Sequence, residues 1–218
     1  MESSSLILAA LLIIPVGMMM FLLERRMRTV VLFFIFGVFM AFYAGEIDGF
    51  ILSVTDISKE LATENVAPIT EEVLKSLPII IYAFLFHPGK QRLISTAVAV
   101  GVGFSLFENV FFFLEARNVN LFWALMRGFG SGMMHALCTL AIGDVMSEVV
   151  KNRVMFFSGS LAALSISVIY HSIFNLIVQS EYSFIGFLLP ILTYIPFLIF
   201  LKSRMNKISN TERKTKND

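Results

Sequence analysis

The sequence predicts an all-α membrane protein: a polytopic helix bundle of about seven transmembrane helices, with its N-terminus outside and its C-terminus in the cytoplasm. Three observations predict this class. Hydrophobic residues make up 57% of the 218 residues and charged residues only 15%, with a mean hydropathy of +0.80, whereas soluble domains carry about 25% charged residues. Seven segments are apolar enough to cross a bilayer, and basic residues gather in alternate connections between them.

The predicted spans follow from length and composition, because a spanning helix needs about 20 mostly apolar residues. The segments that meet this requirement are 6–23, 30–52, 66–86, 93–114, 121–146, 154–178 and 184–201. Their connections are short, so residues 1–201 are predicted to form a single domain. Residues 202–218 form a polar, basic tail that is predicted to be disordered in the cytoplasm.

The first apolar run is predicted to be a retained helix. A signal peptide carries its positive charge before the apolar core, but here Glu2 precedes the run and Arg25 and Arg26 follow it. With this orientation, thirteen Lys and Arg residues fall in inner loops and the tail, whereas the outer loops hold only Lys59 and Arg117. That bias matches the accumulation of basic residues on the cytoplasmic side. The loop 56–65 then lies outside, where it could gate the entry of a substrate.

Composition also excludes some classes of site. Cys138 is the only cysteine, so neither a disulfide nor a thiolate metal cluster can form within one chain. The net charge is only +1, and the basic residues are spread over short loops and a tail. The sequence therefore gives no indication of nucleic-acid binding.

Polar side chains inside four of the predicted spans are the candidate functional residues, because charged groups within a membrane are costly and mark functional sites. At a rise of 1.5 Å per residue, Glu71 and Glu72 lie about 8 Å below the outer end of their helix. Glu108 lies about 9 Å down, and His171 about 10 Å down with Asn175 one turn above it. His135 fits this layer less well, at about 20 Å along its helix, although glycines in 127–132 could bend that helix.

Structural interpretations of these residues stay open. Pro68 suits a first helical turn, where Glu71 and Glu72 would complement the helix dipole. Glu71 and Lys75 can pair as i and i+4 neighbours. The histidines and Asn175 could form hydrogen bonds that only hold helices together. Arg127 can pair with a carboxylate or extend toward the interface.

Four motifs, in order along the chain, resemble those of the PrsW-type intramembrane proteases. They are Glu71-Glu-Val-Leu-Lys75, Gly103-Phe-Ser-Leu-Phe-Glu-Asn109, Met134-His-Ala-Leu and His171-Ser-Ile-Phe-Asn175. This family is distantly related to the CAAX-processing and bacteriocin-processing membrane proteases, which carry Phe-x-x-x-His on the helix where this chain has Phe104-x-x-x-Glu108. The resemblance therefore favours the PrsW type and puts in doubt any mechanism that needs a histidine on that helix.

The resemblance implies glutamate-dependent cleavage of a peptide bond within or beside the membrane. For PrsW itself the substrate class is a single-span anti-sigma factor, which is cut on its outer side during stress signalling. Glu71, Glu72 and His171 would be the essential residues. The protein would be a multi-pass protein of the plasma membrane. In this hypothesis Glu71 or Glu72 is the general base, and His171 and Asn175 donate hydrogen bonds to the oxyanion.

The remaining residues would support that chemistry. Glu108 and His135 are interpreted as orienting or proton-handling partners, Lys75 as the cation that keeps one glutamate ionised, and Asn109 and Arg127 as supporting residues. No cofactor is expected under this hypothesis. The alternative is a zinc metalloprotease, since glutamates and two histidines can supply zinc ligands with an open position for water.

Two further interpretations belong to other classes of protein. Intramembrane Glu and His side chains also form proton or cation pathways in transporters, and a non-catalytic adaptor could use the same groups for packing. Expected partners are a single-span protein substrate and membrane lipid. Two stripes of small residues, at 97–105 and 128–136, allow close helix packing or dimerisation, so a homo-oligomer stays open.

Overall fold

A computed structural model of the chain describes residues 17–20, 22–115, 120–196, 199 and 203, and all regular secondary structure in these residues is helical. The elements are α2 (Arg25–Val54), the single turn α3 (Lys59–Leu61), the π-helix η1 (Ala62–Val66), α4 (Ala67–Phe86), α5 (Lys90–Glu115), α6 (Leu121–Val149) and α7 (Arg153–Gln179). A shorter apolar helix follows at Ser183–Pro196. The predicted all-α class is confirmed, whereas most of the predicted span 6–23 and of the tail 202–218 lies outside the described residues.

Three helices in the described part of the chain are long and apolar enough to cross a membrane: Met27–Val54, Lys90–Glu115 and Arg153–Gln179. Helices α4 and α6 have 20 and 29 residues but carry more polar side chains. The chain is therefore an integral membrane protein by composition and helix length. The total of seven spans and the outward N-terminus stay predictions.

The ends of the helices are set by local chemistry. Helix α4 ends at Phe86 because His87 adopts a left-handed conformation (φ 44°) and donates its N–H to the carbonyl oxygen of Ala83 at 3.1 Å. Pro88 then follows, and a proline cannot continue a helix. Helices α6 and α7 begin at asparagine caps, since Asn120 accepts from the N–H of Trp123 and Asn152 accepts from two N–H groups of the first turn.

The segment 56–65, expected to be a loop, is mostly helical. Ser58 caps α3, and the chain then continues through η1 into α4 without a break. Glu71 and Glu72 consequently lie more than one turn inside a continuous helix, and no acidic residue occupies the first turn of α4. The interpretation of these glutamates as partners of a free helix terminus is therefore wrong. A π-helical turn at this position is typical of functional sites.

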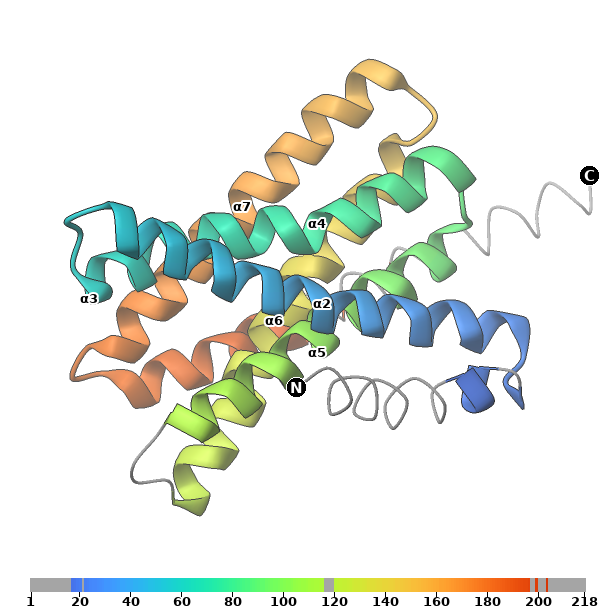
Figure 1. Cartoon of the computed structure of the whole chain (residues 1–218). Helices are drawn as coiled ribbons and strands as arrows, with labels where there is room; N and C mark the ends of the chain where they lie inside the picture. Colours follow the sequence, from blue (N-terminus) through green and yellow to red (C-terminus); the bar gives the residue numbers. More distant parts are fainter. Residues whose placement is uncertain (1–16, 21, 116–119, 197–198, 200–202, 204–218) are drawn as a thin grey trace, which may run out of the picture.

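Close contacts between helices occur at glycines of α5. A Cβ atom added to Gly101 would lie 2.9 Å from the Cα of Ala136 on α6, and one added to Gly103 would collide with the carbonyl oxygen of Phe34 on α2. Helix α5 therefore packs directly against α2 and α6 (Figure 1). The two small-residue stripes face each other inside one molecule, since a Cβ atom added to Gly132 would lie 3.6 Å from Oγ of Ser105. A Cβ atom added to Gly128 would meet no atom of the described residues within 4 Å.

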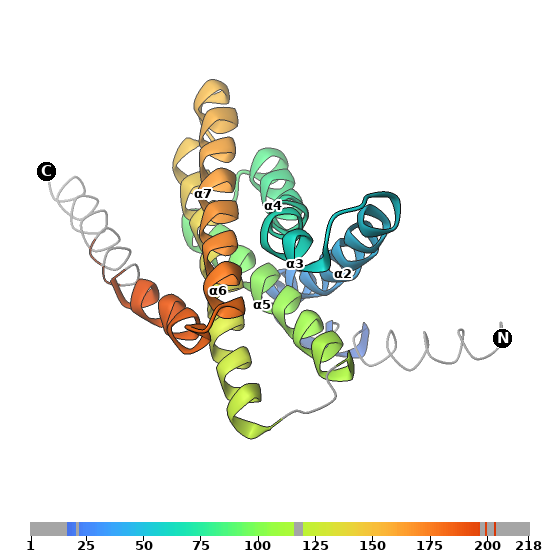
Figure 2. The ribbon, with the colours of Figure 1, turned by 90° about the vertical axis from the view of Figure 1, so that its left-hand side faces the viewer.

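Helix α4 occupies the centre of the arrangement. Figure 2 shows it between α2 and α7, and it also contacts α6. Its inward face changes character along its length: Ile79 and Ala83 join an apolar core with Val100 and Ile142, whereas the earlier turns bury Glu71, Glu72 and Lys75. Large apolar side chains such as Phe157 and Leu114 are exposed, as expected of a surface that faces lipid. The fold thus encloses a polar cluster in an apolar molecule.

Candidate active site

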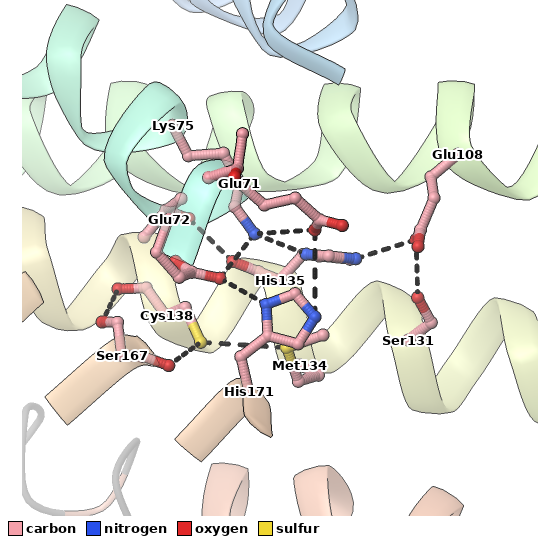
Figure 3. Close-up of polar contacts among 12 residues, drawn as sticks. Glu71, Glu72, Lys75, Glu108, Ser131, Met134, His135, Cys138, Ser167 and His171 are labelled. Carbon is pink, nitrogen blue, oxygen red and sulfur yellow. Dashed lines mark hydrogen bonds and ion pairs between the residues drawn. The ribbon is translucent and has the colours of Figure 1, made fainter. Parts of the chain in front are cut away.

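The ammonium group of Lys75 lies at the centre of the buried polar cluster (Figure 3). Its Nζ is 2.6 Å from Oε1 of Glu72 and 2.6 Å from Nδ1 of His135. Oε2 of Glu71 is farther away, at 3.9 Å. Lys75 therefore bonds to its i−3 neighbour Glu72 rather than mainly to Glu71, the i−4 partner expected from the sequence. The side chain is fully buried, and the ring of Phe104 covers Nζ at 4.4 Å.

These contacts define the tautomer of His135. An ammonium group can only donate a hydrogen bond, so Nδ1 of His135 accepts from Lys75 and the ring proton is on Nε2. That N–H donates to Oε2 of Glu108, 2.9 Å away. His135 is thus a neutral imidazole that links the lysine of α4 to the glutamate of α5.

His171 is the opposite tautomer, with its ring proton on Nδ1. Its Nδ1 lies 2.9 Å from Oε1 of Glu72, so the ring proton on Nδ1 donates to that carboxylate. Its Nε2 then carries a lone pair and faces Oε2 of Glu71 at 3.8 Å, a separation too long for a direct hydrogen bond. His171 and Glu71 therefore present two acceptor atoms to one buried space.

Glu108 is held by partners on α6. The hydroxyl of Ser131 donates to Oε2 at 3.2 Å, and the guanidinium of Arg127 lies 3.3 Å from Oε1. The guanidinium carbon is also 3.6 Å from the centre of the Phe112 ring. Of the two predicted positions for Arg127, the structure has the one that pairs with a carboxylate.

The cluster holds one more acidic side chain than it has basic ones. Three carboxylates, those of Glu71, Glu72 and Glu108, face two cations, Lys75 and Arg127, while both imidazoles can be neutral in the hydrogen-bond pattern described above. One negative charge therefore stays unbalanced unless the site takes up a proton or a cation. Oε2 of Glu71 and Oε2 of Glu72 are buried and have no hydrogen-bond partner among the described residues. Buried polar atoms of this kind require an explanation, such as a bound water molecule or ion.

A metal ion fits this donor set. One ligand atom each from Glu71, His135 and His171 lie within 4.8 Å of one another, and two histidines with one glutamate are a known catalytic zinc set. The oxygen of Glu71 and Nε2 of His171 are available as they stand. Nδ1 of His135 is already bonded to Lys75, so using that nitrogen as a ligand would require the lysine to move.

Two predicted residues do not join the cluster. The side-chain amide of Asn175 donates to the carbonyl oxygen of Thr63 in η1 at 3.0 Å, so it connects α7 to the turn that leads into α4. Asn109 bonds to Ser105 on its own helix at 3.3 Å. The other predicted residues, Glu71, Glu72, Lys75, Glu108, Arg127, His135 and His171, are brought together from four helices.

The sequence did not reveal every residue of the site. Ser131 contacts Glu108 but belongs to a common residue type, and only its position one turn before His135 could have suggested it. Phe104 belongs to the second motif, but the sequence does not predict that its ring covers the ammonium group of Lys75. Cys138 is buried within the same region, where its thiol lies 3.7 Å from the carbonyl oxygen of Ser167 and 3.8 Å from the sulfur of Met134. Cys138 is therefore a buried packing residue of this region.

Comparison with known protein families places the chain beside membrane proteases. A family model described as PrsW family intramembrane metalloprotease matches residues 25–201, a range that includes every residue of the cluster. No curated protein and no solved structure matches the chain.

Proposed function

The chain belongs to the PrsW family of intramembrane metalloproteases, and from this membership and the site geometry we propose that it hydrolyses a peptide bond of a membrane-anchored protein with Glu71 as the general base. The observation that carries the proposal is the pair formed by Oε2 of Glu71 and Nε2 of His171, 3.8 Å apart and facing each other. A water molecule that bonds to both at about 2.8 Å fits this separation. Each of the two atoms can accept a proton from it.

The residues of this site can carry out each proton transfer of peptide hydrolysis. Glu71 takes a proton from water as the oxygen attacks the carbonyl carbon, and the proton passes to Nε2 of His171. The imidazolium then has an N–H on both nitrogens, so Nε2 can donate to the oxyanion or deliver its proton to the nitrogen atom of the leaving amine. The C–N bond breaks as that proton is transferred, and the products are a carboxylic acid and an amine.

Glu72 has a positioning role in this proposal. Its Oε1 accepts from both Lys75 and Nδ1 of His171, which keeps the lone pair of His171 directed toward Glu71. Lys75 holds Glu72 ionised, and Glu108 with Arg127 orients His135 on the far side of the lysine. Asn175 donates to the carbonyl oxygen of Thr63, so in this proposal it positions η1 against α7, and the oxyanion donor is His171.

A metal-dependent form of the same chemistry is the second candidate, and it is favoured by the family description and the ligand spacing of Glu71, His135 and His171. A bound zinc ion would supply Lewis-acid activation of the attacking water. Metal analysis of the purified protein, with and without a chelator, separates the two forms. Stoichiometric zinc that is lost together with activity would overturn the metal-free form, whereas activity that survives complete metal removal would overturn the zinc form.

We further propose that the substrate is a single-span membrane protein of the anti-sigma-factor type, cut near the outer surface of the plasma membrane. This rests on the resemblance of the four motifs to the PrsW type. The test compares the membrane proteomes of cells that express the wild-type protein and the His171→Ala variant. We expect a fragment of a single-span protein only with the wild type. Identical fragment patterns in the two samples would contradict the assignment of His171.

A further inference from the structure

A groove of about 760 Å³ lies between α2, α4 and the start of α5. Its walls are apolar and include Leu32, Phe36 and Met40 from α2 and Leu77, Ile81 and Phe86 from α4. All of these except Met40 are exposed. No residue of the buried polar cluster lines the groove, because Leu77 and Ile81 lie on the exposed face of α4 whereas Glu72 and Lys75 are fully buried.

One end of the groove is basic. Arg25, the first residue of α2, and Arg92, in the first turn of α5, both line it. Both side chains are exposed, and neither makes a hydrogen bond or ion pair within the part of the chain that the structure describes. Two of the candidate membrane spans begin beside them, at Met27 and Lys90. The arginines therefore lie at the level where a membrane's hydrocarbon ends and its headgroups begin.

The groove is long enough to cover the hydrocarbon of one leaflet. Fifteen residues of α2 separate Arg25 from Met40, which corresponds to about 22 Å along the helix. Half of a bilayer's hydrocarbon core is about 15 Å thick. An acyl chain whose headgroup is at the arginines can therefore lie against apolar side chains over its whole length.

We infer that this groove binds one anionic phospholipid, with an acyl chain between α2 and α4 and the headgroup phosphate between Arg25 and Arg92. Two guanidinium groups that have no carboxylate partner among the described residues are complementary to a phosphate, which each of them can contact with two hydrogen bonds. A peptide segment of the substrate fits this place less well, because no side chain of the polar cluster, Glu71 included, lines the groove.

The inference is tested by native mass spectrometry of the full chain in detergent. The protein is titrated with phosphatidylglycerol and, separately, with phosphatidylcholine that has the same acyl chains. The variants are the double change Arg25→Gln with Arg92→Gln and, as the matched control, Arg153→Gln. Arg153 is also an exposed arginine at the start of a helix, and it does not line the groove.

We expect the wild-type protein and the Arg153→Gln control to bind one phosphatidylglycerol at least about tenfold more tightly than phosphatidylcholine, since each basic residue near a headgroup contributes to anionic-lipid binding. The double variant should lose this preference. Equal affinity of the wild type for the two lipids, or a preference that the double variant keeps, would overturn the inference. So would a photoreactive residue at position 81 that captures a membrane protein in place of lipid.

Discussion

Lys75 is the residue that connects the two halves of the site, because it bonds at once to Glu72 and to His135. Sequence alone could predict that an intramembrane lysine beside two glutamates has a role. It could not predict that Glu72, rather than Glu71, is the closer partner, since i+3 and i+4 neighbours are both within reach on a helix. The closer partner of Lys75 is determined by His135 and His171 on other helices, because His135 contacts Lys75 and His171 contacts Glu72. The positions of these two histidines cannot be read from the sequence around Lys75.

We predict that Lys75→Met lowers the free energy of unfolding by about 3 to 5 kcal/mol, because it leaves the buried carboxylate of Glu72 without its cation. The control is Lys59→Met, at an exposed position on α3, which should change stability by about 0.5 kcal/mol or less. Denaturant unfolding in detergent measures both. Equal effects of the two changes would show that the ammonium of Lys75 is not buried and paired as described.

The same pairing can be examined by a double-mutant cycle. Glu72→Gln in the Lys75→Met background should cost less stability than Glu72→Gln alone, because neighbouring residues that share an ion pair are not additive. If the effect of the double change equalled the sum of the two single effects to within about 0.3 kcal/mol, the two side chains would act independently.

At the scale of elements, the helices between residues 25 and 179 could be predicted to within a few residues, because continuous apolar runs of this length form helices in a membrane. The helical character of 56–65 could not be predicted in this way, since that segment is polar and its α3 and η1 turns depend on the cap at Ser58 and on the contact between Thr63 and Asn175. The depth of His135 was also uncertain from the sequence. Its position is set by the close approach of Gly101 to Ala136, which fixes the register of α5 against α6.

That contact gives a prediction about Gly101, a residue without a side chain that could take part in the reaction. Gly101→Ala places a methyl group 2.6 Å from the carbonyl oxygen of His135 and 2.9 Å from the Cα of Ala136, so α6 must move away from α5. Overpacking of this kind costs about 1 to 3 kcal/mol, and it should also reduce proteolytic activity by displacing His135 from Glu108. Thermal unfolding and the cleavage rate measure the two effects.

The matched control lies on α6. Among the described residues, a Cβ atom at Gly128 meets nothing within 4 Å, so Gly128→Ala should be neutral or should stabilise the helix by up to about 1 kcal/mol. If Gly101→Ala behaved like Gly128→Ala in both measurements, the direct α5–α6 packing described above would be contradicted.

At the scale of the whole molecule, the arrangement of basic loops predicts that α3 faces the outside and that the α6–α7 connection faces the cytoplasm. Cys138 is buried, so an introduced exposed cysteine can be labelled in an otherwise wild-type chain. Both Glu60 and Lys151 are exposed. With a membrane-impermeant maleimide on intact cells, we expect labelling of Glu60→Cys but not of Lys151→Cys, and labelling of both after lysis. Labelling of Lys151→Cys but not of Glu60→Cys in intact cells would show that the topology is the reverse of the predicted one.

The burial of the polar cluster inside the helix bundle strengthens the interactions among its few charged and polar side chains. The surrounding helices bury Glu71, Glu72 and the two histidines away from bulk solvent, and electrostatic interactions are stronger in a medium of low dielectric constant. The sequence indicates which spans carry the acids and imidazoles, but only their packing brings Oε2 of Glu71 to 3.8 Å from Nε2 of His171. The proposed water activation depends on that separation.

The most direct test is the cleavage rate of the Glu71→Gln variant on a substrate fragment identified with the wild-type protein. This change keeps the size of the side chain but removes the proton acceptor, so we expect the rate to fall by at least about 100-fold. Glu46→Gln, at an exposed position on α2, should cleave at the wild-type rate. If folded Glu71→Gln protein cleaved as fast as Glu46→Gln, the assignment of Glu71 as the base would be wrong.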